Sequence, residues 1–175
     1  MKTLQVRASA SEFDTRELNL SDLSDLLWAA NGINRPESGK RTASSAQNAR
    51  DVDIYVCKPE GIYLYDAAQH RMDLTARGDH RTAVAGSQEE VAVAPCLLLL
   101  VSDMSRFSSG EDSVRRVWAA IDVGIVSQNI SLFCAATDLS TRPRVTMEQQ
   151  KLRELLKLGE SQLLLLNHPV SYRKK

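Results

Sequence analysis

Basic side chains recur at four places in the chain, at two of them together with small hydroxyl residues, a combination that suits an anion. Guanidinium and ammonium groups donate charge-assisted hydrogen bonds to phosphate, and hydroxyls add further donors. The four groups are Arg7-Ala8-Ser9, Lys40-Arg41 with Ser44, Ser45 and Asn48, Arg142 with Arg144, and Arg173-Lys174-Lys175. Because scattered basic residues are common on protein surfaces, their spacing alone favours ordinary solvated charges.

Residue types that carry hydrolytic or metal chemistry are present without the spacing that such chemistry needs. The sequence contains no GxSxG, HExxH, P-loop or GxGxxG motif. The histidines are far apart in the sequence. We expect His70 and His80 to be solvated, and His168 to pack at the end of a buried strand.

The cysteines Cys57, Cys96 and Cys134 are widely spaced within apolar runs. An odd number without a CxxC pair argues against a disulfide framework or a zinc site. We therefore expect three small, buried core residues. Cys134 also lacks the neighbouring cation that a thiolate nucleophile needs.

Length and charge restrict the class of protein. The chain has 175 residues, which indicates a single domain over residues 1–175. Lys and Arg number 22, as do Asp and Glu, so the formal net charge is zero. We therefore expect neither nucleic acid nor an anionic membrane as a partner. The N-terminus shows no apolar signal-peptide region, which favours a cytoplasmic protein.

One apolar segment, residues 117–136, has the length of a membrane span. Asp122, Gln128 and Asn129 lie in its middle, and polar groups inside a membrane are costly. We therefore predict a helix buried in a protein core.

The N-terminal part of the chain is predicted to hold a helix and a hairpin. Apolar residues at helical spacing indicate a helix over 19–31, with Ser21 as its N-cap. Residues 32–50 are polar and predict a long loop. The alternating runs 51–57 and 61–67 predict two antiparallel strands joined by a turn.

The rest of the chain mixes both element types, although residues 68–90 are polar and are not assigned to an element. The expected elements are a buried strand at 95–101, a buried helix at 112–137, an extended segment at 140–145, a short helix at 147–157 and a buried strand at 162–167. Thr146 and Gln149 have the spacing of a capping box for the short helix, and Gly159 would end it. Strands that do not strictly alternate with helices indicate an α+β fold with an antiparallel or mixed sheet.

Taken in order, these segments resemble the FMN-dependent nitroreductase family. The opening LQVRASASEF resembles the family's Arg-x-Ser-x-Arg-x-Phe element, and residues 23–48 resemble its next helix and Pro-Ser-x-x-Asn loop. The later segments DVDIYV, APCLLLLVSD, WAAIDVGIVSQNISLFCAA and LLLLNHPVSY follow in the family's order. The chain most resembles a short bacterial branch related to the flavin dehydrogenases that oxidise azolines in peptides.

The resemblance implies an α+β, nitroreductase-like fold with a central, mainly antiparallel sheet wrapped by helices. It also implies an intertwined homodimer with FMN at the subunit interface. The helix at 112–137 would be the core and dimer element, and the C-terminal segment would be exchanged onto the partner.

The same resemblance implies the FMN contacts of each residue group. Arg7, Ala8 and Ser9 would hold the phosphate and ribityl end, and Ser11 would lie near the N1–O2 edge. Ser44, Ser45 and Asn48 would reach the isoalloxazine ring from the other chain. Pro143, Arg144 and Val145 would pass the N5–O4 edge, with the amides of Arg144 and Val145 as donors, and Arg173 and Lys174 would close on the phosphate.

Three positions depart from the family's pattern. Ser11 stands where an Arg or Lys is usual, so the cation expected beside N1–O2 is missing, and Lys40 or Arg41 could substitute for it. Ser44 stands where Pro is common, and Ser171 where Gly is usual.

The implied activity is transfer of electrons from NAD(P)H through FMN to a nitroaromatic or quinone acceptor by a ping-pong mechanism. The flavin performs this chemistry, so no catalytic side chain is assigned. Three alternatives stay open. They are a flavin dehydrogenase or oxidase acting on a peptide or small metabolite, a non-catalytic FMN-binding protein, and a cofactor-free structural dimer.

Overall fold

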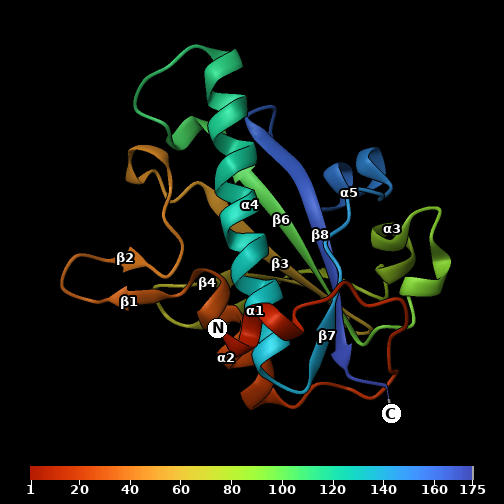
Figure 1. Ribbon diagram of the computed structural model, residues 1–175. Helices are drawn as coiled ribbons and strands as arrows, with labels where there is room; N and C mark the ends of the chain where they lie inside the picture. Colours follow the sequence, from red (N-terminus) through yellow and green to blue (C-terminus); the bar gives the residue numbers. More distant parts are fainter. Residues whose placement is uncertain (175) are drawn as a thin grey trace.

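An antiparallel sheet forms the centre of the computed structural model, which describes residues 1–174 (Figure 1). The strand order is β5-β4-β3-β6-β8-β7, and every neighbouring pair is antiparallel. In that order the strands are Arg71–Arg77, Gly61–Asp66, Val52–Lys58, Cys96–Asp103, Gln162–Tyr172 and Leu139–Thr141. A separate two-stranded sheet joins β1 (Ile33–Arg35) and β2 (Lys40–Arg41). The expected α+β class and mainly antiparallel sheet are therefore confirmed.

Helices cover both faces of the sheet. The α-helices are α1 (Lys2–Val6), α2 (Leu20–Asn31), α3 (Arg81–Ala85), α4 (Asp112–Ala136) and α5 (Gln149–Leu155). Short 3-10 turns are η1 (Ala46–Asn48), η2 (Glu89–Val91) and η3 (Met104–Arg106). Figure 1 shows α4 crossing one face, with α3 and α5 on the other side of the sheet.

The side-chain alternation of the central strands divides the core into two layers. Leu98 and Leu100 of β6 pack in the cluster that includes α2 and α4. Leu97 and Leu99 pack in the cluster that includes α3 and α5. Successive strand residues face opposite sides, so a strand covered on both faces must be apolar at nearly every position. This explains the unbroken apolar run that predicts a buried strand here.

The helix over 19–31 is confirmed, but its predicted cap is wrong. The N-cap is Asn19, whose side-chain Oδ1 accepts the Asp22 N–H at 2.7 Å. Asn19 has extended backbone angles (φ −67°, ψ 157°), as an N-cap requires. The helix therefore begins at Leu20, before the predicted cap Ser21.

The predicted capping box of the short helix is also wrong. Helix α5 begins at Gln149 after Glu148 and has no side-chain cap. The Gln149 side chain instead donates to the Leu164 carbonyl at 3.0 Å, and the Thr146 carbonyl accepts from Asn167. Both residues hold this helix against β8.

Strand β8 is longer than predicted and pairs with strands of its own chain. It continues through Tyr172 between β6 and β7, with Leu98 opposite His168. The Arg173 N–H still donates to the Asp138 carbonyl of the same chain, at 2.9 Å. The expected exchange of the C-terminal segment onto a partner is therefore wrong for residues 162–173.

Helix α4, predicted as a helix buried in a protein core, is apolar on two faces, and only one of them is buried within this chain. Its inward face includes Val123, Val126 and Ile130 in the α2-side core. Val117 and Ile121 on its outward face are 57% and 54% exposed. By length and composition α4 could cross a membrane, but its inward face is packed in the protein core. The segment is therefore a core helix with an additional apolar surface.

The three cysteines are buried and unbridged, as predicted. Burial raises the pKa of the thiols of Cys57 and Cys134 to about 12. The pKa of Cys96 is also raised by burial. All three therefore stay protonated at neutral pH.

Candidate functional site

The N-terminal candidates lie on an extended segment that follows α1. Arg7 has extended backbone angles (φ −62°, ψ 120°), and the Ala10 N–H donates to the Thr141 carbonyl at 3.0 Å. Ala8 and Ala10 line a hollow of about 220 Å³ beside α4 and β7. Arg7 and Ser9 are the sequence neighbours of Ala8 at this hollow, and Ser11 follows Ala10.

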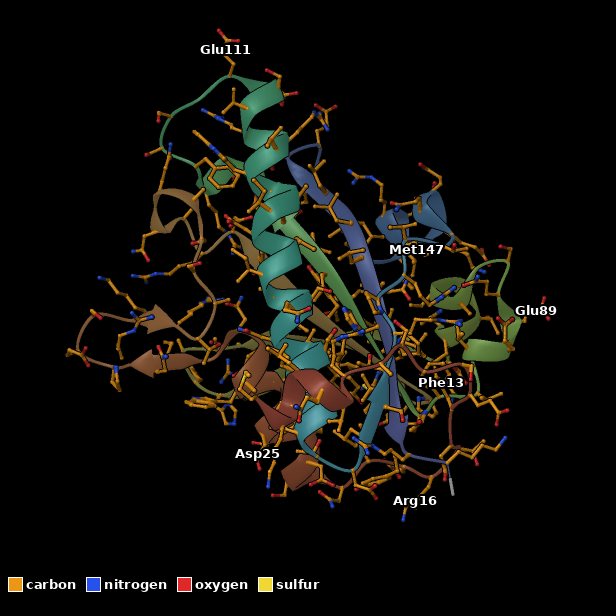
Figure 2. The ribbon with its side chains drawn as sticks, in the orientation of Figure 1. Phe13, Arg16, Asp25, Glu89, Glu111 and Met147 are labelled. Atoms are coloured by element: carbon orange, nitrogen blue, oxygen red, sulfur yellow. The ribbon has the colours of Figure 1, made fainter. Side chains whose placement is uncertain are left out.

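Phe13 anchors the end of this segment (Figure 2). Its ring is buried in the core cluster that includes α3 and α5. The neighbouring Asp14 N–H donates to Ser171 Oγ at 3.0 Å. Ser11 therefore lies between two fixed points, Ala10 on the Thr141 carbonyl and Phe13 in the core, and Arg7, Ala8 and Ser9 directly precede the first of them.

The C-terminal candidates lie next to the N-terminal ones. Arg173 lines the same hollow as Ala8, and its Nη2 donates to the Ala135 carbonyl at 3.1 Å. Lys174 pairs with Glu12 at 2.9 Å. The structure thus brings together two basic groups that are more than 160 residues apart in the sequence.

The segment 143–145 comes shortly after Thr141, whose carbonyl accepts from the Ala10 N–H. Pro143 and Val145 line a second hollow with Arg144. The predicted donation by the Arg144 amide is wrong, because this N–H already donates to the Asn167 carbonyl at 2.8 Å. Val145 is exposed, and its N–H has no acceptor within residues 1–174.

The Arg144 side chain is also used inside the fold. It is buried, and its Nη1 donates to Asn167 Oδ1 at 2.8 Å. Its Nη2 donates to the Ala85 carbonyl at 2.6 Å. Arg144 therefore holds the 143–145 segment against β8 and α3.

Ser44, Ser45 and Asn48 lie apart from these groups, beside the β1–β2 hairpin. Figure 1 shows η1 and this hairpin on one side of α4, with β7 on the other. The three residues line a hollow of about 380 Å³ together with cations of the hairpin. One chain therefore does not place the two expected halves of the FMN site next to each other.

Hydrogen bonds hold the 44–50 loop in an uncommon backbone conformation. Gln47, Asn48 and Arg50 have φ of 55°, 55° and 53°, a left-handed conformation that is rare outside glycine. The Ser45 Oγ accepts the Arg50 N–H at 2.9 Å. The Gln47 side chain reaches toward α4, donating to Ser109 Oγ at 2.7 Å.

Two buried carboxyl groups, Asp51 and Asp122, lie next to this loop, and one of them binds its backbone. Asp122 of α4 is 2% exposed, and its Oδ2 accepts the Ala46 N–H at 2.8 Å. Asp122 lies close to Asp51, whose Oδ2 accepts from Ser102 Oγ. Burial first, and then the neighbouring Asp51, raise the pKa of Asp122 to about 7.

The sequence did not assign this carboxyl pair a role, although a signal was present. Asp122 interrupts the most apolar segment of the chain, and a buried acid must have a partner. The identity of that partner depends on how β3 packs beneath α4. Sequence spacing does not show this.

His168 is a structural residue rather than a ligand or base. It is fully buried in β8, where Ser127 Oγ lies 2.8 Å from Nε2 and Thr141 Oγ1 lies 3.1 Å from Nδ1. Burial lowers the pKa of His168 to about 3, so the ring is neutral. Residues 1–174 also contain no cluster of three or more His, Cys, Asp or Glu that could hold a metal ion.

Comparison with known families gives one family over almost the whole chain. The profile described as "Nitroreductase family" matches residues 4–171. A candidate nitroreductase of Methanocaldococcus jannaschii is 31% identical over 171 residues, covering 91% of this chain and 85% of the relative.

Comparison with solved structures agrees. A candidate nitroreductase from Ralstonia eutropha has a TM-score of 0.91 and 31% identity, covering 99% of this chain and 82% of that one. A chain of the E. coli microcin synthetase McbBCD complex has a TM-score of 0.84 and 14% identity, covering 96% of this chain and 69% of that one. At that identity the second structure shows the fold alone.

Proposed function

We propose that this chain, which belongs to the nitroreductase family, is an FMN-dependent oxidoreductase of the cytoplasm that acts as a single-domain homodimer. It would take electrons from NADH or NADPH and pass them to a small acceptor such as a nitroaromatic or quinone, by a ping-pong mechanism. One observation carries the proposal. Ala8 and Arg173, from opposite ends of the chain, line the same hollow as Thr141, and the 143–145 segment comes shortly after Thr141.

The residues present fit a cofactor with a phosphate at one end and a polar ring edge at the other. Arg7, Ser9, Arg173 and Lys174 would bind the phosphate and ribityl end, where Ala8 leaves space for it. Val145 would donate its N–H to the N5–O4 edge, and Ser11 would lie beside N1–O2 without supplying a cation. FMN supplies hydride transfer when bound, so the chain's residues bind and orient it.

A second copy of the chain would complete this site. Ser44, Ser45 and Asn48 of that copy would reach the ring, since those of the same chain lie across α4 from the phosphate residues. The outward face of α4 supports a symmetric contact. Val114, Val117 and Ile121 are exposed there, as is Leu4 of α1.

Gly124 gives a further reason to place a partner on this face. A glycine inside a helix destabilises it by about 1 kcal/mol relative to alanine. Within residues 1–174 a Cβ at Gly124 would meet nothing within 4 Å. Packing inside the chain therefore does not require the glycine, whereas the close approach of a second helix would.

An absorption spectrum of the purified protein, titrated anaerobically with NADH and NADPH, tests the proposed function. We expect a flavin band that bleaches with a nicotinamide and returns with a nitroaromatic or quinone. A band that neither nicotinamide bleaches would support a dehydrogenase of another substrate or a non-catalytic flavin protein. No band after addition of FMN would contradict the proposal.

Replacing Arg7 by Ala is expected to raise the Kd for FMN at least tenfold. The variant would remove a charge-assisted hydrogen bond to the phosphate, and such bonds contribute about 1.5–3 kcal/mol. Lys2→Ala is the matched control, since it removes an exposed cation from α1, a few residues before the site. Fluorescence titration of flavin-free protein measures both values. Equal affinity in the Arg7→Ala variant and the wild type, with the fold intact, would contradict the role of Arg7.

A further inference from the structure

The hollow beside the β1–β2 hairpin is lined by cations without a matching carboxylate. Its lining residues are Arg35, Lys40, Arg41, Ala43, Ser44, Ser45 and Asn48. Within residues 1–174, none of the three cations forms an ion pair within 4 Å. The hollow therefore combines positive charge, hydroxyl donors and an amide.

Arg41 is the least satisfied of these cations. Its Nε is buried and has no hydrogen-bond partner among the described residues. The nearby acid, Asp53, is occupied by Arg106, whose guanidinium donates to both carboxylate oxygens at 2.9 and 2.6 Å. Burial lowers the pKa of Arg41, and the neighbouring Arg106 and Arg50 lower it further against the opposing effect of Asp53.

Hydrogen bonds fix the Arg35 side chain and the backbone of the hairpin that carries Lys40 and Arg41. Arg35 Nη2 donates to the Arg41 carbonyl at 2.6 Å, and Arg50 Nη2 donates to the Ser38 carbonyl at 3.2 Å. The Thr42 N–H donates to the Gly32 carbonyl at 2.9 Å, which joins the hairpin to the end of α2. Fixed donors bind an anion with less loss of conformational entropy.

We propose that this hollow binds an oxyanion group, phosphate or carboxylate, carried by the molecule that exchanges electrons with the flavin. This inference rests on the proposed function, since Ser44, Ser45 and Asn48 in the same hollow are the residues assigned to the flavin ring. Arg41, with Lys40 beside it, would bind the oxyanion. The group could be the 2′-phosphate of NADPH or a carboxylate or phosphate on the other substrate.

Two matched substrate pairs distinguish these sources. NADPH and NADH differ by the 2′-phosphate, and 4-nitrobenzoate and 4-nitrobenzamide differ by the charge of one group. In the FMN-loaded Arg41→Gln variant, we expect the KM of the anionic member of one pair to rise about fivefold, as for a partly exposed charge contact. The KM of its neutral counterpart and kcat should change less than twofold. The pair that responds identifies the source.

Lys40→Gln should act in the same direction, and Lys151→Gln on α5 is the control for a lost surface lysine. Isothermal titration of the FMN-loaded protein with inorganic phosphate measures the site without turnover. We expect binding that Arg41→Gln weakens about fivefold and Lys151→Gln leaves unchanged.

Three outcomes would overturn the inference. They are wild-type kinetics that do not distinguish either pair, phosphate binding that Arg41→Gln leaves unchanged, and loss of FMN itself from Arg41→Gln, which would assign the hollow to the cofactor. If the wild type binds no FMN, the proposed function fails separately. Phosphate titration of the Arg41→Gln and Arg7→Ala variants then still shows whether the hollow binds an anion.

Discussion

If the proposed dimer forms through α4, replacing Ile121 by Lys is expected to convert it into a monomer and to release the proposed FMN. Ile121 is 54% exposed on the outward face of α4, beside Val117. In a symmetric dimer each substitution enters the interface twice. Burying an unpaired ammonium costs about 3 kcal/mol or more, so two copies would weaken dimerisation by more than about a thousandfold.

Light scattering after size exclusion measures the mass, and absorbance measures the flavin retained per chain. The secondary structure should be unchanged, because the Ile121 side chain is not part of the core clusters of its own chain. Leu74→Lys is the matched control, since Leu74 is an exposed apolar residue on the edge strand β5. A variant that stays dimeric with its full flavin content would show that α4 does not form the interface.

At pH 8 the Asp122→Asn variant is expected to be more stable than the wild type by about 2 kcal/mol. The pKa of Asp122 is raised to about 7 in the folded protein, against about 3.9 in an unfolded chain. The proton held by the fold therefore stabilises the protein fully below about pH 4. This contribution decreases as the pH rises toward 7 and is lost above it, up to about 4 kcal/mol. Local relaxation and water entry reduce such burial penalties in proteins, so we expect about half of that limit.

Asparagine has the same shape, stays uncharged and still offers an oxygen to the Ala46 N–H. Urea unfolding at pH 5 and pH 8 measures the effect, with the difference between variant and wild type expected to be small at pH 5. Asp122→Ala is the control. It removes the acceptor of the Ala46 N–H and should lower the free energy of unfolding at both values. If Asp122→Asn has the pH dependence of the wild type, Asp122 does not titrate in this range.

The elements that the sequence predicts well are those with a long apolar stretch. Core residues pack against both faces of β6 and β8 and against the inward face of α4. This packing requires apolar side chains at those positions. Strand β5 was not predicted because both of its faces are largely exposed at the sheet edge. Polar and apolar residues do alternate over 71–77, and this strand signal was overlooked because the surrounding segment 68–90 is mostly polar.

The candidate site was predictable in part, because family resemblance supplies an order of segments but no contacts. It placed Arg144 on the segment that follows β7. It did not show that Asn167 and Ala85 already use the donors of that residue. The carboxyl pair Asp51 and Asp122 was missed because it depends on the packing of α4 over β3.

Because the three thiols are buried, their reaction with a thiol reagent reports local unfolding of the elements that cover them. Cys57, Cys96 and Cys134 lie in β3, β6 and α4 and are at most 1% exposed. A disulfide reagent can attack only after the surrounding element has separated from the core. Labelling followed by mass analysis would therefore time the opening of sheet and helix residue by residue. The molecule needs no introduced probe for such an experiment.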